Sequence, residues 1–218
     1  MVETTIEPLD KTISGLRVSP AQHLHGAFVD AGVTGALGVR VREEQFLTMV
    51  GLRVPVGSPD RARLAKILGA ELPERCGEVA TGHDVVVLWL SPDEFLVISQ
   101  SVAGSTLVSY LRAGVSEGGA AVVDLSANRT TLRLEGPSAR AVLEKGCPLD
   151  LHPRAHASGT AVVTNIGRVP VILWKVEADS YRILPRASYA DFLGRWLIDA
   201  MAEFKVISTS SIRRLGSG

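Results

Sequence analysis

Short apolar runs, some alternating with polar residues and some continuous, follow one another along most of the chain and are separated by glycine and proline. Runs of this length are typical of strands joined by turns. Val85–Leu90 and Phe95–Ser99 flank the turn Ser91–Glu94 and are expected to pair as a hairpin. Strands are predicted over residues 46–54, 85–90, 95–99, 121–125, 128–134, 160–165, 170–176 and 181–185.

Other stretches carry apolar residues three and four positions apart, which is the spacing of one face of a helix. Ser58 and Pro59 suit the N-cap and the first position of such a helix, and Gly69 suits its end. Ser188 suits the start of a longer helix. Helices are predicted over residues 59–68, 105–113, 138–143 and 188–204, with one short helix within 20–31.

The order strand, helix, hairpin, helix occurs twice, without a fixed repeat period. The sequence therefore predicts an α+β fold of two small modules, 45–118 and 119–205, each an antiparallel sheet with helices. Residues 1–44 are interrupted by glycine and proline and are predicted to form an extended N-terminal arm. Such an arm packs either on its own body or on another chain. Residues 206–218 are predicted to be a disordered tail.

The 218 residues carry a formal net charge of zero, with 23 Lys plus Arg against 23 Asp plus Glu. Nucleic acids and anionic membranes attract a basic excess, so neither partner is expected. Near-zero charge weakens the repulsion between molecules and favours a protein that works with partners. The basic residues are 18 Arg and 5 Lys. This bias reflects either the codon use of a GC-rich genome or an interface, where Arg is favoured.

No apolar run approaches the roughly 20 residues that a membrane-spanning helix needs. The first residues, beginning Met1-Val-Glu, lack the apolar core of a secretion signal. We therefore expect a cytoplasmic protein. Cys76 and Cys147 lie far apart in the sequence and are expected to be free thiols in that compartment.

Three residues of the second module, Cys147, His152 and His156, could be drawn as a metal site. Zinc usually takes four ligands from clustered pairs. Pro153 also disturbs the helical spacing of the two histidines. A small metalloprotein that uses these three residues stays open as one hypothesis.

Dinucleotide, phosphate-loop and nucleophile motifs are absent from the sequence. Asp93, Glu94 and Asp124 are the acidic candidates for acid–base chemistry. A hairpin turn and a strand end are ordinary places for surface acids. The motifs alone therefore indicate an α+β protein without an evident active site.

A set of phrases follows one order between residues 19 and 204: Phe46–Val54, Gly57–Pro59, Val87–Val97, Val123–Ser126, Leu132–Pro137, Lys145–Pro153, Ala178–Arg182 and Ser188–Phe192. In this order they resemble the gamma subunit family of heterotetrameric sarcosine oxidase. A single phrase has little specificity for the family, whereas the whole set in this order is fairly specific.

The fold that this resemblance implies is aminomethyltransferase-like, as in the folate-dependent aminomethyltransferases and the N-terminal part of a tRNA-modification GTPase. The stretch from Asp124-Leu-Ser126 to Leu143 is similar to the opening of the first module of those enzymes. A later hairpin there carries an acid that acts on the folate-bound substrate. The matching stretch here, Asn165–Leu173, contains no acid, and a proton cannot be taken without such a group. This departure favours a structural copy of the fold.

The resemblance implies a complex of alpha, beta, gamma and delta subunits that oxidises sarcosine with oxygen. Its products would be glycine, hydrogen peroxide and formaldehyde or methylene-tetrahydrofolate. FAD, FMN, NAD, tetrahydrofolate and zinc would lie on other subunits, so no catalytic, cofactor-binding or metal-binding residue is expected here. A structural, non-catalytic role follows, and a stand-alone folate-binding aminomethyltransferase-like protein is the rival hypothesis. Candidate contact residues, chosen by residue type, are Arg42, Trp89, Asp93, Glu94, Arg129, Arg140 and His152.

Overall fold

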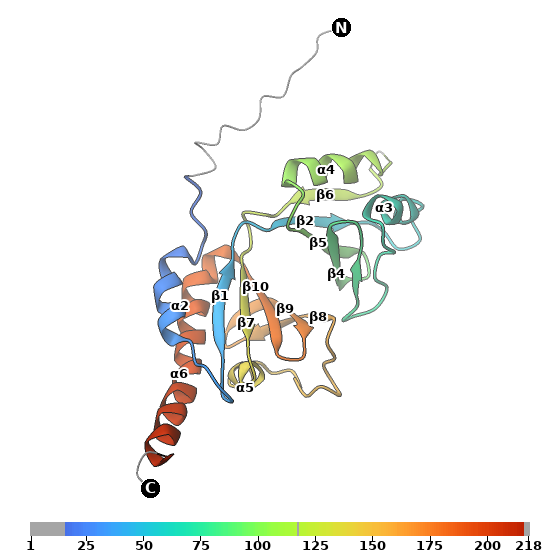
Figure 1. Cartoon of the computed structure of the whole chain (residues 1–218). Helices are drawn as coiled ribbons and strands as arrows, with labels where there is room; N and C mark the ends of the chain where they lie inside the picture. Colours follow the sequence, from blue (N-terminus) through green and yellow to red (C-terminus); the bar gives the residue numbers. More distant parts are fainter. Residues whose placement is uncertain (1–15, 117, 216–218) are drawn as a thin grey trace.

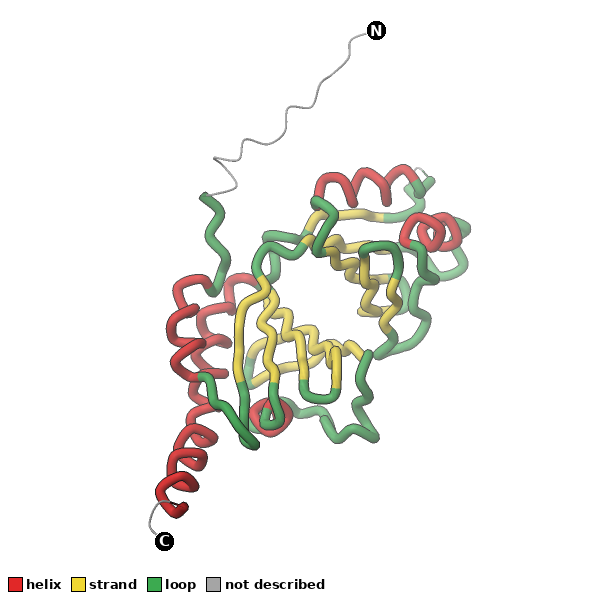
Figure 2. The backbone as a smooth tube through the Cα atoms, in the orientation of Figure 1, coloured by secondary structure: helices red, strands yellow, loops and turns green. Residues whose placement is uncertain are grey.

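The computed structural model describes residues 16–116 and 118–215 of the chain (Figure 1). In these residues the strands form two five-stranded sheets. The two sheets face each other, and helices cover the outer face of each (Figure 2). The layers are therefore helix, sheet, sheet and helix, which lets each sheet bury apolar residues on both of its faces.

The first sheet has the strand order β3-β4-β5-β2-β6, and neighbouring strands are antiparallel. Helices α3 (Asp60–Leu68) and α4 (Gly104–Ala113) pack on its outer face. Gly69 ends α3 in the left-handed conformation, with φ of 69°, as the sequence predicts. The strands are β2 (Thr48–Arg53), β3 (Val79–Thr81), β4 (Val85–Ser91), β5 (Glu94–Ser99) and β6 (Ala121–Asp124).

The second sheet has the order β1-β7-β10-β9-β8 and is also antiparallel. Its strands are β1 (Arg40–Glu44), β7 (Thr131–Glu135), β8 (Thr160–Ile166), β9 (Val169–Glu177) and β10 (Ser180–Pro185). The helical elements beside it are η1 (Gln22–Leu24), α2 (His25–Ala31), α5 (Ala139–Glu144), η2 (Ala187–Tyr189) and α6 (Ala190–Leu215).

Two pairs of strands run from one sheet into the other. Residues 45–47 join β1 to β2, and residues 125–130 join β6 to β7. Because β1 pairs with β7 and β2 pairs with β6, the four strands form one bent antiparallel ribbon. Phe46 lies at the bend with a left-handed φ of 58°. The two sheets thus share a single backbone scaffold.

Apolar side chains fill the spaces between the layers. One cluster lies between the second sheet and α2, α5 and α6, and another lies between the first sheet and its helices. A third cluster takes residues from both sheets: Met49, Leu88, Leu96, Ile98, Ala161, Ile172, Trp174 and Leu184. We call it the inter-sheet core. Its burial is the apolar contribution that holds the two sheets together.

The predicted α+β fold with two antiparallel sheets is confirmed. The hairpin of β4 and β5 is also confirmed, with Trp89 opposite Phe95. The predicted strand 46–54 begins two residues later, because Phe46 belongs to the bend. β3 was not predicted, since three residues are too few to show a period.

The segment expected to form an arm folds onto the second sheet over its described part. Residues 22–31 form η1 and α2, and β1 pairs with β7 from Arg40 opposite Glu135 to Glu44 opposite Thr131. The pattern does not predict β1 because Val41 is its only buried residue and the others are charged. Residues 1–15 lie outside the described part of the chain.

Two further boundaries differ from the prediction. β6 was assigned to the second module, but it pairs with β2 in the first sheet because the ribbon changes sheets after it. α6 continues to Leu215, well into the expected disordered tail, since 195–215 contains no glycine or proline to interrupt it. Residues 216–218 lie outside the described residues. No described helix, α6 included, has the length and apolar character to cross a membrane.

Replacing Leu96 by alanine tests the inter-sheet core. Leu96 is fully buried between the sheets, so Leu96→Ala should lower the free energy of unfolding by about 2–5 kcal/mol. Urea unfolding of the purified chain measures this change. Val163→Ala on β8, where the residue is 59% exposed, is the control and should change stability by less than about 0.5 kcal/mol. Equally small effects for both variants would contradict the packing of the two sheets.

Candidate functional site

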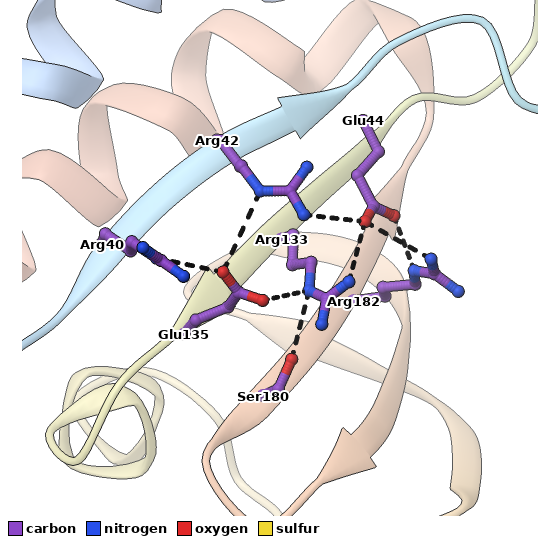
Figure 3. Close-up of polar contacts among 7 residues, drawn as sticks. All are labelled: Arg40, Arg42, Glu44, Arg133, Glu135, Ser180 and Arg182. Carbon is purple, nitrogen blue, oxygen red and sulfur yellow. Dashed lines mark hydrogen bonds and ion pairs between the residues drawn. The ribbon is translucent and has the colours of Figure 1, made fainter.

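The inner face of the second sheet has an apolar half and an ionic half. Side chains alternate between the two faces along each strand. On β9, Ile172 and Trp174 face the first sheet and join the inter-sheet core. On β7, Leu132 and Leu134 face the helices, and the residues that follow each of them, Arg133 and Glu135, are charged. The polar residues of this inner half form what we call the ionic cluster: Arg40, Arg42, Glu44, Arg133, Glu135, Ser180 and Arg182 (Figure 3).

Glu44 is the centre of the ionic cluster. Its carboxylate accepts hydrogen bonds from Arg182 Nε at 2.6 Å, Arg133 Nη1 at 3.2 Å and Arg42 Nη2 at 3.3 Å, so three strands meet at one side chain (Figure 3). Burial raises the pKa of Glu44, but the hydrogen bonds and charges of Arg182 and Arg133 outweigh it, and the pKa lies below its usual value. Glu44 is therefore ionised at neutral pH.

Glu135 is the second acid of the cluster. Arg40 Nε lies 3.1 Å from its carboxylate and Arg42 Nε lies 3.9 Å from it, while Arg133 Nε makes a close ion pair with it. Arg133 also donates from Nε to Ser180 Oγ at 3.2 Å. Four guanidinium groups are thus held by two carboxylates. On the other side of the cluster, the Arg182 guanidinium lies over the Trp174 ring, 4.8 Å from its centroid.

Two cavities lie beside the ionic cluster and meet at Gln100. The first has a volume of about 600 Å³ and is lined by residues 21–28 on one side and by Arg42 and Arg133 on another. The second, of about 440 Å³, lies between β4 and β5 of the first sheet and Arg182 of the second. We call the two together the inter-sheet cleft. It is the hollow in which polar side chains of both sheets meet.

Three of the predicted contact residues, Trp89, Asp93 and Glu94, lie on the β4–β5 hairpin. Asp93 accepts a hydrogen bond from Arg53 Nε at 2.9 Å, which lowers the pKa of Asp93. Glu94 is exposed next to it, and Trp89 lies half-buried on the same hairpin. Arg129 lies outside the hairpin and donates from Nη1 to the Leu184 backbone O at 3.0 Å. Burial and the charge of Arg186 lower the pKa of Arg129, and the charge of Glu94 opposes that shift.

The remaining predicted contact residues lie elsewhere. Arg42 belongs to the ionic cluster. Arg140 on α5 pairs with Glu144, one helical turn further along, at 3.5 Å. His152 is exposed in the loop after α5. The structure therefore does not gather all seven residues into one surface.

The three residues considered for a metal site are held by local contacts. Cys147 is buried, with Sγ 4.0 Å from Thr164 Oγ1, and His156 is buried, with Nδ1 3.3 Å from Thr160 Oγ1. His152 is exposed. Within residues 16–116 and 118–205, no group of three or more His, Cys, Asp or Glu side chains is arranged to hold a metal ion. The geometry gives the metal hypothesis no support.

The residues that resemble the opening of the folate enzymes have a structural task. Asp124 Oδ1 accepts hydrogen bonds from the Ser126 backbone N at 2.9 Å and from Ser126 Oγ at 2.6 Å. Ser126 Oγ in turn accepts one from the Met49 backbone N at 3.0 Å. These contacts fix the bend of the ribbon. The β8–β9 hairpin, which covers the stretch 165–173, has no carboxylate there. The hypothesis of folate chemistry on this chain therefore finds no acid at that position.

Most of the ionic cluster was missed by the sequence analysis. The available signal is the alternation of Arg133 and Glu135 with Leu132 and Leu134 along one strand. This alternation predicts a strand with one apolar face. It does not reveal that the charged face turns toward a second sheet, because that depends on the bend of the ribbon far along the chain.

Solved structures show which class of fold this is. One chain of "Heterotetrameric Sarcosine Oxidase from Corynebacterium sp. U-96 in complex with pyrrole 2-carboxylate" is similar with a TM-score of 0.83 and 46% identity, over 87% of this chain and 96% of that one. The glycine cleavage system aminomethyltransferase T from Bartonella henselae matches with a TM-score of 0.61 and 15% identity, over 84% of this chain and 57% of that one. The fold is therefore aminomethyltransferase-like.

Sequence comparison narrows the class to a family. The model of the sarcosine oxidase, gamma subunit family matches residues 58–203. The sarcosine oxidase subunit gamma of Corynebacterium sp. (strain U-96) is 46% identical over 190 residues, which are 87% of this chain and 92% of the relative. That of Arthrobacter sp is 45% identical over 192 residues, 88% of this chain and 93% of the relative. The chain belongs to the sarcosine oxidase gamma subunit family.

Replacing Glu44 by glutamine tests the centre of the ionic cluster. Glu44→Gln keeps the size of the side chain but removes the charge that three guanidinium groups share, so the free energy of unfolding should fall by about 3 kcal/mol. Glu144→Gln, which breaks the exposed pair with Arg140, is the matched control and should cost less than about 1 kcal/mol. Urea unfolding at pH 7 compares the two variants. Equal losses of unfolding free energy would mean that the Glu44 carboxylate contributes no more to stability than an exposed one.

The same carboxylate predicts a pH dependence. The pKa of Glu44 is lower in the folded chain than in the unfolded one. Its contribution to stability is therefore complete above its unfolded pKa, about 4.3, and is lost as the pH falls through its folded pKa. Between about pH 5 and pH 3 the wild-type chain should lose more stability than Glu44→Gln, as measured by urea unfolding at each pH. Parallel curves for the two proteins would contradict this linkage.

Proposed function

We propose that this chain is the gamma subunit of a heterotetrameric sarcosine oxidase complex, in which it has a structural role in assembly. The observation that carries the proposal is the match to a chain of the heterotetrameric enzyme, at 46% identity over 96% of that chain. Near-complete coverage makes it reasonable that the same faces of the fold meet the same kind of partners. Alpha, beta and delta subunits are the proposed partners, and the cytoplasm is the proposed location.

The chemistry of the proposed complex is carried by the other subunits. Sarcosine, oxygen and water would give glycine, formaldehyde and hydrogen peroxide, with methylene-tetrahydrofolate in place of free formaldehyde when the folate is present. FAD, FMN, NAD, tetrahydrofolate and zinc would be bound by alpha, beta and delta. The absence of an acid in the stretch 165–173 supports a non-catalytic role for this chain.

The surface of the β4–β5 hairpin is the first proposed subunit contact. Glu94 is exposed at the turn, Asp93 beside it pairs with Arg53, and Trp89 lies half-buried on the same hairpin, while the charge of Glu94 acts on the half-buried Arg129. Trp and Arg are over-represented among residues that contribute most to binding at interfaces. Arg42, Arg140 and His152 are proposed as contacts on other faces of the chain.

Purification from cells that express the whole complex tests the proposed function. Affinity purification through a tag on this chain should recover three other chains. The eluate should show the absorbance spectrum of a flavin and should consume oxygen when sarcosine is added. A colourless single chain would contradict the proposal. Titration with tetrahydrofolate would then test the rival, since a stand-alone folate-binding protein would bind it without partners.

Reversing one charge at the hairpin tests the proposed contact. Glu94→Lys should raise the dissociation constant of this chain for the rest of the complex by about tenfold, the effect expected for one like-charge contact at an interface. Glu74→Lys, an exposed glutamate in the loop before β3, is the control and should change binding by less than twofold. Quantitative pull-down at fixed salt gives both values. The contact is refuted if the two variants bind equally well.

A further inference from the structure

The ionic cluster contains hydrogen-bond donors without acceptors. Arg133 donates from Nε to Ser180 and from Nη1 to Glu44, and Arg42 donates from Nη2 to Glu44. Among the described residues, Arg133 Nη2 and Arg42 Nη1 have no hydrogen-bond partner. The Arg133 side chain is 19% exposed and the Arg42 side chain is 48% exposed, so an acceptor that enters from outside can reach these donors. These donors therefore favour an external acceptor.

Both arginines line the first cavity of the inter-sheet cleft. Glu44 of the ionic cluster lines this cavity with them, and its oxygens already accept hydrogen bonds from Arg42, Arg133 and Arg182. Glu43 also lines the cavity, but its oxygens are already occupied by Ser19 Oγ, the Ala21 backbone N and Thr130 Oγ1. A carboxylate is the group that matches unused guanidinium donors in both charge and geometry.

Other groups around the cavity extend this preference. His25 and the amide side chains of Gln22, Gln45 and Gln100 are exposed along its border. Each amide can donate or accept a hydrogen bond. Asp84, an acid just before β4, lines the second cavity and not the first. The first cavity is thus the part of the cleft suited to an acid.

Apolar side chains continue the surface beyond Gln100. Phe46 is 44% exposed and Val18 is 76% exposed, and the Arg17 guanidinium lies 4.5 Å from the centroid of the Phe46 ring. Phe46, Arg17 and Gln100 line one further hollow together. A small anion would leave these apolar groups in water, whereas a protein segment could cover them.

We infer that the first cavity of the inter-sheet cleft receives an acidic side chain from another subunit of the complex. The Asp or Glu carboxylate binds Arg42 Nη1 and Arg133 Nη2, and apolar residues that flank it cover Phe46 and Val18. This inference rests on the proposed function, because it takes the partner from the same assembly. Glu44 and Glu135 hold the two arginines in place before the partner arrives, which lowers the entropy lost on binding.

Two arginines of β1 provide a matched test. Arg42 and Arg40 lie two residues apart on one face and both contact Glu135, but only Arg42 lines the cavity. The purified complex is prepared with a labelled gamma chain, and the rate at which unlabelled chain replaces it is measured. Arg42→Gln should speed this exchange by about tenfold or more, because truncating a desolvated charge contact acts on dissociation. Arg40→Gln should leave it within about twofold, as expected for an exposed pair.

Two substitutions at Gln100 make the test independent of folding defects. Gln100 is exposed and lines the same cavity as Arg42. Gln100→Glu should speed exchange by repelling the incoming acid, and Gln100→Lys should slow it or leave it unchanged. Changes in the same direction for both charges would overturn the inference.

The outcomes separate the two proposals. If the wild-type chain joins no complex, the proposed function fails. If it joins, and Arg42→Gln and Arg40→Gln exchange at the same rate, only the acidic-segment inference fails. A wild-type exchange rate that does not rise between low and high salt would also overturn it, because a contact between charged groups weakens with salt.

Discussion

The ion pair of Glu44 with Arg182 is the constraint on which the rest of this structure depends. The carboxylate is nearly buried, and it joins β1 to β7 and β10 through guanidinium groups of two other strands. Removing two charges from water is costly unless further hydrogen bonds complete the arrangement. Arg133, Arg42 and Glu135 complete it here. The polar half of the sheet therefore exists as one connected network.

This network determines how far the two sheets close on each other. Where the inner face is apolar, at Ile172 and Trp174, the sheets pack through the inter-sheet core. Where it is ionic, they part and leave the inter-sheet cleft. The bent ribbon of β1, β2, β6 and β7 connects the two regions in one backbone. The fold shared with an aminomethyltransferase thus keeps its architecture here, with arginine side chains beside the cleft and no acid in residues 165–173.

Local sequence signals predicted the parts of the fold that depend on interactions between residues close together in the sequence. The β4–β5 hairpin, the helix ended by Gly69 and the strand class of most apolar runs follow from turn residues and periodicity. The sequence did not predict β1, because four of its five residues are charged and its burial comes from contacts with α2 and β7. The ionic cluster was not predicted for a related reason. Arg133 lies 89 residues and Arg182 lies 138 residues from Glu44 in the sequence, and only the complete topology brings them within hydrogen-bond distance.

We propose that this chain works as a structural subunit of an oxidase and not as an enzyme by itself. Native mass spectrometry of the assembly isolated through this chain tests that claim most directly. The account predicts one copy each of four different chains, one of them of 23.2 kDa, with flavin retained after this chain is selectively dissociated. A flavin or folate that leaves together with this chain would contradict the account, as would a 23.2 kDa protein without partners.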